Sequence, residues 1–242
     1  MRVVAIIQAR MGSSRLPGKV LRKVMEKPLL YYQLIRVSRS TKLDDLVVAT
    51  STLPKDDRIV NFCTSHNINY YRGSEQDVLT RYVEAARESG ADVIVRLTAD
   101  CPLMDPRLID HLVESFISKQ DVDYVSNVIS RTYPRGLDIE VFSKSALTKV
   151  NEWATTASHR EHVTNYFLEH PDKFRLKNVS NQKDISFHRW TVDTIDDFQL
   201  IEHILTELYP NDRYFSVDDV LKILEDHPEW YHINSGVKQK GW

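Results

Sequence analysis

The first half of the chain alternates between short apolar runs and segments in which apolar residues recur every three or four positions. The runs at 3–7, 45–50 and 92–97 are rich in β-branched residues, which is typical of strands buried on both faces of a sheet. A shorter strand is expected at 69–71. The periodic segments predict helices at 28–39, 56–65, 77–89 and 106–119. This alternation predicts an α/β fold with a mostly parallel, doubly wound sheet.

The pattern changes after residue 123. Strands are expected at 124–127, 138–142, 174–179 and 185–192, and helices at 143–151, 160–170, 195–208 and 217–226. Residues 228–242 lack periodicity and predict a loose end. Because no repeat or low-complexity linker interrupts the chain, we expect a single domain over 1–242. The block at about 128–180 is expected to project from it as a small β/α arm.

Three segments that follow predicted strands are candidates for a binding site. In doubly wound sheets, ligands bind in the crevice outside the carboxyl ends of the strands. Gln8 follows the first strand, Thr50 and Ser51 end the second, and Thr98 to Asp100 follow the third. We therefore expect these segments to meet at one edge of the sheet.

The segment 8–21, QARMGSSRLPGKVL, combines cations with small turn residues. Arg10, Arg15 and Lys19 supply positive charge, and Ser13 and Ser14 supply hydroxyl groups. Backbone N–H groups of such a loop form a concavity that binds anions, and three cations would neutralise a triphosphate. The segment is neither a GxxxxGK[ST] phosphate loop nor a GxGxxG dinucleotide loop.

Asp100 supplies the opposite charge at the same predicted edge. Magnesium prefers oxygen ligands and usually takes one or two carboxylates together with substrate phosphates. A carboxylate that faces a cationic phosphate loop therefore predicts a Mg²⁺ site, although a turn-capping role for Asp100 is an alternative.

Composition excludes several classes of partner. The 242 residues carry a formal net charge of -2, so no global field attracts the chain to nucleic acid or to an anionic membrane. The two cysteines, Cys63 and Cys101, are not in metal-binding spacing. No segment reaches about 18 apolar residues, and the N-terminal run is too short for a signal peptide. We therefore expect a cytoplasmic protein without nucleic-acid or membrane partners.

Four motifs together resemble the sugar nucleotidyltransferases, specifically the cytidylyltransferases that activate Kdo or sialic acids with CTP. They are AIIQARMGSSRLPGKVL, RGSEQDVLTR, VRLTADCPL and RWTVDTIDD. The resemblance is closest to the SpsF branch of spore coat polysaccharide synthesis, and it implies a Rossmann-like fold. The family usually has proline where this chain has Gln8, and this departure weakens inference about the acceptor sugar.

The resemblance implies roles for individual residues. Arg10, Arg15, Lys19 and Asp100 would act in catalysis, and Asp100 and Asp193 would bind Mg²⁺. The expected nucleotide-binding residues are Gln8, Ala9, Arg10, Ser13, Ser14, Arg15, Lys19, Thr50, Ser51, Gly73 and Thr98. A helix N-cap is an equal alternative for Thr50 and Ser51.

The middle of the chain is expected to bind the sugar and to form a dimer arm, as related enzymes do. The expected sugar-binding residues are Arg135, Asp138, Glu140, Arg160 and Arg189. An arginine such as Arg135 would meet a carboxylate or phosphate of the acceptor, whereas Asp138 and Glu140 could equally belong to a solvated strand face.

The predicted reaction is transfer of CMP from CTP to a sugar, which is expected to be acidic and to have eight or nine carbons. A sugar oxygen attacks the α-phosphorus in line, and pyrophosphate leaves. The alternatives are a uridylyl- or guanylyltransferase acting on a sugar phosphate, a glycosyltransferase that uses a finished nucleotide sugar, and a scaffold without activity. Only the resemblance selects cytidine.

Overall fold

A computed structural model describes residues 1–118 and 121–239, and its centre is a seven-stranded sheet in the order β5–β4–β1–β6–β8–β7–β9. Six strands run in one direction, and β8 runs against them, because its pairings with β6 and β7 are antiparallel. The mostly parallel sheet that the sequence predicts is confirmed. The strand bounds are β1 Val3–Gln8, β4 Asp45–Ser51, β5 Asn69–Gly73, β6 Val93–Thr98, β7 Tyr124–Ser126, β8 Glu140–Ser143 and β9 Leu176–Asn178.

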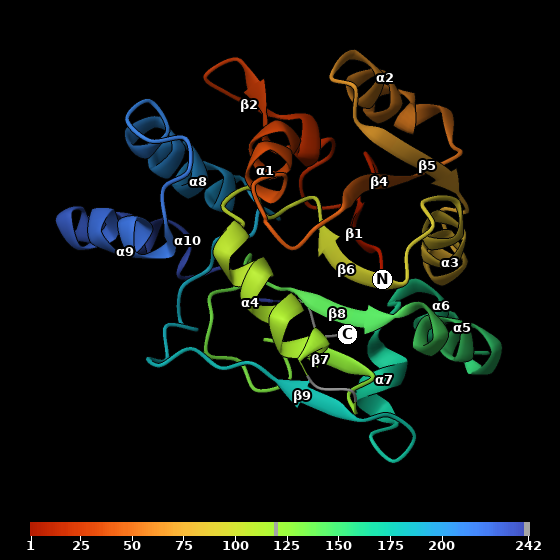
Figure 1. Ribbon diagram of the computed structural model, residues 1–242. Helices are drawn as coiled ribbons and strands as arrows, with labels where there is room; N and C mark the ends of the chain where they lie inside the picture. Colours follow the sequence, from red (N-terminus) through yellow and green to blue (C-terminus); the bar gives the residue numbers. More distant parts are fainter. Residues whose placement is uncertain (119–120, 240–242) are drawn as a thin grey trace.

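Helices cover both faces of the sheet (Figure 1). One face carries α1 (Leu29–Val37), α2 (Asp57–Ser65), α4 (Pro106–Ile117), α8 (Ile195–Leu208) and α9 (Val217–Asp226). The other face carries α3 (Val78–Glu88), α5 (Lys144–Trp153) and α7 (Asn165–Glu169), and α6 (Ala157–Glu161) adjoins α3. A small hairpin, β2 (Lys23–Val24) with β3 (Lys27–Pro28), lies outside the main sheet.

The core consists of two apolar layers divided by the sheet. Successive residues of β1 alternate between them: Ala5 and Ile7 pack with α1 and α4, and Val4 and Ile6 pack with α3 and α5. All four side chains are fully buried. A strand that is apolar at every position is therefore what a sheet covered on both faces requires.

The structure corrects three predicted elements. Within the described residues, 185–192 form no strand. Only an isolated bridge joins Arg135 to Arg189, and the segment crosses the strand ends, with the Val192 N–H donating to the Asp100 carbonyl. The helix expected at 160–170 divides into α6 and α7, because the chain leaves helical conformation at His162 and buries Val163 in the core.

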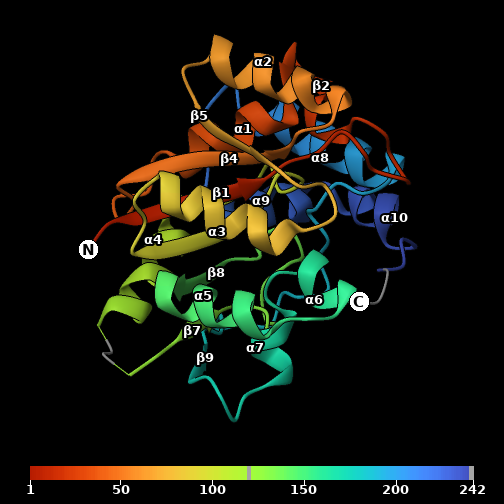
Figure 2. The same cartoon turned by 90° about the vertical axis from the view of Figure 1, so that its right-hand side faces the viewer.

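The third correction concerns the end of the chain. Residues 228–234 form the short helices η3 (Pro228–Trp230) and α10 (Tyr231–Asn234), and α10 packs against α8. The rest of the predicted loose end includes 240–242, which lie outside the described residues, as does the last residue of the helix predicted at 106–119. Figure 2 shows β9 and α7 at the end of the molecule far from β4 and α2. The projecting arm and the single-domain boundary remain predictions.

Candidate active site

A cleft of about 970 Å³ opens at the carboxyl edge of the parallel strands. It is lined by the ends of β1 and β6, by the loop 8–20, and by residues from 128–140, 161–169 and 191–193. Of the residues expected to bind nucleotide, sugar or metal, those that line it are Gln8, Ala9, Arg10, Ser13, Ser14, Arg15, Lys19, Thr98, Asp100, Arg135, Asp138, Glu140 and Asp193. The sheet edge that topology predicts for ligands is therefore where the cavity lies.

The loop after β1 folds back on itself and directs Lys19 into the cleft. The N–H groups of Ser13 and Gly18 both donate to the Met11 carbonyl at 3.0 Å, and the Met11 N–H donates to Asp56 at 2.7 Å. Gly18 has a φ of 69°, a left-handed conformation that favours glycine. The turn leads into the short helix η1 (Lys19–Leu21), so the lysine turns back toward the loop.

The Lys19 ammonium bridges two carboxylates that lie far apart in the sequence. Its Nζ donates to Asp100 Oδ2 at 2.7 Å and to Asp193 Oδ1 at 2.8 Å. The other oxygen of Asp193 accepts from Arg15 and from Arg189, each at 2.8 Å. We call Arg15, Lys19, Asp100, Arg189 and Asp193 the lysine–aspartate cluster. It joins the loop, the end of β6 and the segment before α8 into one charged unit.

Two opposing influences act on Asp100. Burial disfavours its ionised form, but the Lys19 charge, its hydrogen bond and a 2.6 Å hydrogen bond from the Thr98 hydroxyl lower the pKa of Asp100 to about 2. Burial likewise disfavours charged Lys19, but Asp100 and Asp193 together raise the pKa of that lysine. Lys19 and Asp100 are therefore both ionised near neutral pH.

Asp193 is held by a capping box at the start of α8. The Thr194 hydroxyl accepts from the Asp197 N–H, and Asp197 Oδ2 accepts from the N–H groups of Asp193 and Thr194. Asp197 is fully buried and also accepts from Arg189 Nε at 2.8 Å and from Asn234 Nδ2 at 3.0 Å. Asp197 is thus the support on which Asp193 and Arg189 are positioned.

Other residues of the cleft lining form separate charge pairs. The Arg131 guanidinium makes two hydrogen bonds to Asp138, at 2.6 and 2.8 Å, and Arg96 pairs with Glu140. The Arg135 side chain also lines the cleft, and among the described residues no side chain pairs with it. We call Arg131, Arg135, Asp138 and Glu140 the acceptor wall. Asp138 lies just before β8 rather than in it, but it lines the same cleft as Glu140. Glu140 is buried, so the alternative of a solvated strand face is wrong for this residue.

Gln8 is oriented by Arg96. Arg96 Nη2 donates to Gln8 Oε1 at 3.3 Å. Because a guanidinium only donates, the amide oxygen faces Arg96 and the amide nitrogen is available to the cleft.

Five residues expected in the site lie outside the lining of this cleft. Thr50 and Ser51 are buried, and the Ser51 hydroxyl donates to Asp56. The Gly73 α-carbon packs against the Arg81 stem and the Tyr71 ring. Arg160 pairs with Asp77 at 2.6 Å, and Arg189 acts through Asp193 and lines a separate cavity.

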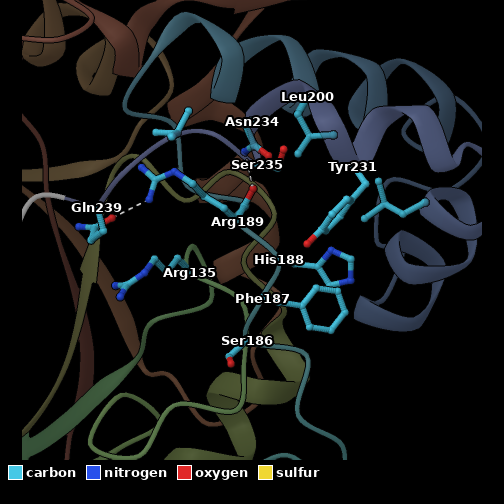
Figure 3. A pocket seen from close by; sticks show the side chains of 12 residues that line it. Arg135, Ser186, Phe187, His188, Arg189, Leu200, Tyr231, Asn234, Ser235 and Gln239 are labelled. Atoms are coloured by element: carbon cyan, nitrogen blue, oxygen red, sulfur yellow. Dashed lines mark hydrogen bonds between the residues drawn. The ribbon is translucent and has the colours of Figure 1, made fainter.

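That second cavity, of about 140 Å³, lies beside the cleft (Figure 3). Phe187, His188 and Tyr231 gather on one side of it, and the Arg189 side chain on the other donates to Gln239 at 2.6 Å. Arg135 and Gln239 line both cavities. The two spaces therefore adjoin at the acceptor wall.

Sequence analysis missed five charged residues that line the cleft: Arg81, Arg96, Arg131, Glu161 and Glu169. Arg131 belongs to no recognisable motif. Arg81 lies on α3, where Asp77 four residues earlier suggests a helix-surface pair. In the structure Asp77 caps α3 and pairs with Arg160 instead, and Arg81 is 2% exposed. The signal that could have identified Arg81 is its position in an otherwise apolar stripe of α3.

The arrangement of Asp100 and Asp193 fits a hard divalent cation. Both carboxylates hold one ammonium group, so their oxygens lie within reach of a single cation. Two carboxylates are the usual protein contribution to a Mg²⁺ that also binds phosphates. Among the residues the structure describes, no group of three His, Cys, Asp or Glu side chains forms a metal cage. The substrate would therefore have to supply further ligands.

Comparison with known proteins decides the family. A family model described as cytidylyltransferase matches residues 4–214. This chain belongs to the cytidylyltransferase family. Spore coat polysaccharide biosynthesis protein SpsF of Bacillus subtilis is 35% identical over 83% of this chain and 85% of its own. An uncharacterized protein of Methanocaldococcus jannaschii is 39% identical over 100% of this chain and 98% of its own. The predicted family and SpsF branch are confirmed.

Solved structures agree with the cytidylyltransferase fold. A cytidylyltransferase from Leptospira borgpetersenii serovar Hardjo-bovis superimposes with a TM-score of 0.92 at 33% identity, covering 100% of this chain and 99% of that one. A CMP:2-keto-3-deoxy-manno-octonic acid synthetase complexed with CTP gives a TM-score of 0.66 at 17% identity, covering 86% and 99% of the two chains. None of the helices in the described parts of this cytidylyltransferase is both long and apolar enough to span a membrane.

Proposed function

We propose that this cytidylyltransferase transfers CMP from CTP to an acidic sugar of eight or nine carbons and releases pyrophosphate. The observation that carries the proposal is the Lys19 ammonium held between Asp100 and Asp193 in a cleft large enough for a nucleotide and a sugar. Such a cluster contains positive charges that would neutralise a triphosphate and carboxylates that would bind the cation accompanying the triphosphate.

The side chains of the chain act mainly by positioning and by stabilising charge. Arg10, Arg15 and Lys19 would face the phosphates and neutralise charge that develops on the leaving pyrophosphate. Arg189 and Asp197 hold Asp193 in a fixed position. The charged side chains of the site would therefore not have to reorient during the reaction.

Mg²⁺ is the cofactor we propose, held by Asp100 and Asp193. When bound, it would neutralise phosphate oxygens and lower the pKa of the attacking sugar hydroxyl. Lys19 would then give up part of its present contact with the carboxylates and bind phosphate.

The acceptor would lie along the acceptor wall. Arg135 lines the cleft there without a carboxylate partner among the described residues, so its guanidinium is available for a sugar carboxylate. The charge of Arg131, by contrast, is already compensated by Asp138.

We further propose a cytoplasmic homodimer that acts in the synthesis of surface polysaccharide or glycan, with contacts through residues 128–180. CTP and a small sugar are its partners, with no role for nucleic acid.

Mass spectrometry of reaction products tests the function directly. The protein is incubated with Mg²⁺, each of the four nucleoside triphosphates, and a panel of acidic sugars, neutral sugars and sugar phosphates. We expect a CMP-sugar and pyrophosphate from CTP with an acidic sugar. A product from UTP or GTP with a sugar phosphate would contradict the proposal and support the corresponding alternative. A parallel incubation with a finished nucleotide sugar in place of the triphosphates tests the glycosyltransferase alternative, and transfer only there would likewise contradict the proposal.

A further inference from the structure

The last described residues of the chain reach the active site. Asn234, at the end of α10, is 5% exposed, and its Nδ2 donates to the Arg189 carbonyl at 2.9 Å and to Asp197 Oδ1 at 3.0 Å. Gln239 follows in the same segment and lines both the cleft and the small cavity beside it. This segment lies beyond 4–214, the residues that the family model matches. Gln239 is therefore a part of the site that the family model does not cover.

Arg189 sets the orientation of the Gln239 amide. Its guanidinium is fixed by two carboxylates, because Nε donates to Asp197 and Nη2 donates to Asp193, each at 2.8 Å. The remaining nitrogen, Nη1, donates to Gln239 Oε1 at 2.6 Å. Since a guanidinium has only donors, the amide oxygen faces it and the amide nitrogen points away. No acceptor among the described residues pairs with that nitrogen, and the Gln239 side chain is exposed, so Nε2 is available to a ligand.

The place where the two cavities meet is poor in acidic side chains. Arg135 and Gln239 line both cavities, and Figure 3 shows them on the side of the small cavity away from the Phe187 and Tyr231 rings. No Asp or Glu is among the described residues that line the small cavity. The acids that line the cleft are Asp100, Asp138, Glu140, Glu161, Glu169 and Asp193. A carboxylate of the substrate would therefore meet the least repulsion at this junction.

The surroundings of Arg135 also favour an anionic ligand. Burial lowers the pKa of its guanidinium, and the nearby Arg131 and Arg189 lower it further, against the opposing influence of Asp138. Asp138 is itself already bound by Arg131 through two hydrogen bonds. A carboxylate beside Arg135 would therefore supply a negative charge that the fold does not provide there.

The chemistry of the acceptor requires its acid group to lie close to the reacting atoms. In a 2-keto sugar acid, the carboxylate is bonded to the carbon that carries the attacking hydroxyl. That hydroxyl has to reach the α-phosphorus beside the proposed Mg²⁺ ligands, Asp100 and Asp193, so the carboxylate must lie near the lysine–aspartate cluster. Gln239 satisfies this condition, because one guanidinium, that of Arg189, donates to both Gln239 and Asp193.

We propose that Gln239 binds the carboxylate of the acceptor together with Arg135, and that the C-terminal segment thereby takes part in selecting an acidic sugar. This inference rests on the proposed function. Gln239 Nε2 would donate to one carboxylate oxygen and the Arg135 guanidinium to the other. A carboxylate only accepts hydrogen bonds, so it fits two donors that converge from different parts of the chain. A sugar without the acid group would leave both donors without a partner.

Steady-state kinetics of two variants of Gln239 test the inference. The assay uses CTP, Mg²⁺ and each acidic sugar that the unaltered protein consumes, beginning with Kdo and N-acetylneuraminic acid. Gln239→Met removes the donor, and KM for the acceptor should rise about tenfold, as expected for one hydrogen bond to a charged group. Gln239→Glu keeps an oxygen for Arg189 but places a carboxylate against the carboxylate of the sugar, so the rise should be larger. In both variants kcat and KM for CTP should be unchanged.

The matched control is Lys238→Met. Lys238 directly precedes Gln239, is exposed, and has no hydrogen-bond or ion-pair partner among the described residues. Removing its charge should change none of the three constants. Because Gln239 is also exposed, both of its variants should unfold at the temperature of the unaltered protein.

Methyl esters of the same sugars separate a direct contact from an indirect one. The ester carries no negative charge, so the increase in KM caused by Gln239→Glu should be much smaller for the ester than for the acid. Such non-additivity indicates that the two groups interact. An equal increase for acid and ester, an unchanged KM for the acceptor in both variants, or a rise in KM for CTP alone would overturn the inference. Absence of a CMP-sugar from every acidic sugar with the unaltered protein would instead contradict the proposed function itself.

Discussion

The lysine–aspartate cluster and the acceptor wall both line one cleft, yet their charges are organised differently. In the cluster, Asp193 is shared by Arg15, Lys19 and Arg189, so each side chain is held by several others. In the wall, Arg131 pairs with Asp138 separately, and Arg135 stands apart. Because the charges of the cluster hold one another in place, we expect the cluster to bind one fixed chemical feature, such as a triphosphate with its cation. We expect the separate pairs of the acceptor wall to be the part of the site that changes when the acceptor changes.

The largest expected effect comes from removing the arginine that supports the cluster. In Arg189→Met, the fully buried Asp197 keeps its charge but loses its ionic partner. Breaking a buried pair in this way costs about 3–5 kcal/mol, and the loss should appear as a lower free energy of unfolding in urea. Adding Asp197→Asn should restore part of the stability. If the single variant is as stable as the unaltered protein, the cluster is not a mutually supporting unit.

Asp100→Asn tests the catalytic half of the comparison. The change keeps the shape of the side chain but removes the charge that Lys19, and the proposed Mg²⁺, would meet. By analogy with a lost oxyanion donor, we expect pyrophosphate release to slow by roughly 10²–10³-fold, or about 2.7–4 kcal/mol. Asp138→Asn in the acceptor wall is the matched control, and its effect should be smaller. Circular dichroism should show an intact fold, and near-normal release would remove Asp100 from the proposed metal site.

The contrast between the two regions also explains what sequence could predict. Lys19 and Asp100 lie after predicted strands that are mostly apolar, so the rules for parallel sheets place both at the carboxyl edge of the sheet. The prediction of a strand at 185–192 is wrong, because Trp190 and Val192 are buried where the segment crosses the ends of the strands. The spacing of apolar residues does not distinguish such a crossing segment from a strand that is hydrogen-bonded into the sheet. The spacing of Asp77 and Arg81 suggests a pair on one helix face, but Asp77 pairs with Arg160, which is 83 residues away and which local spacing does not indicate.

The charge of Lys19 should make the cluster sensitive to acid. The pKa of Asp100 is about 2 instead of 3.8, a difference worth about 2 kcal/mol. Because the folded-state pKa is depressed, this stabilisation is complete above about pH 4 and disappears as the pH falls through the folded value.

Urea unfolding in EDTA, from pH 7 downward, measures this contribution. Lys19→Met should be less stable than the unaltered protein by about 2 kcal/mol near neutral pH, and the difference should shrink toward zero near the folded-state pKa of Asp100. Lys23→Met, which removes an exposed lysine paired with Glu26, should give a small difference across the range. A difference for Lys19→Met that does not change with pH would contradict the link to Asp100.

The smallest expected effect lies in the acceptor wall. Arg135→Ala removes a guanidinium that has no partner among the described residues, so the folded chain loses little. If Arg135 binds the sugar carboxylate, KM for the acceptor should rise about tenfold, as expected for one charged hydrogen bond, while KM for CTP stays unchanged. Arg87→Ala, on the outer face of α3, removes the same charge and should change neither constant. A rise in KM for CTP alone would indicate that Arg135 contacts the nucleotide. The lysine–aspartate cluster and the acceptor wall would then not bind separate substrates.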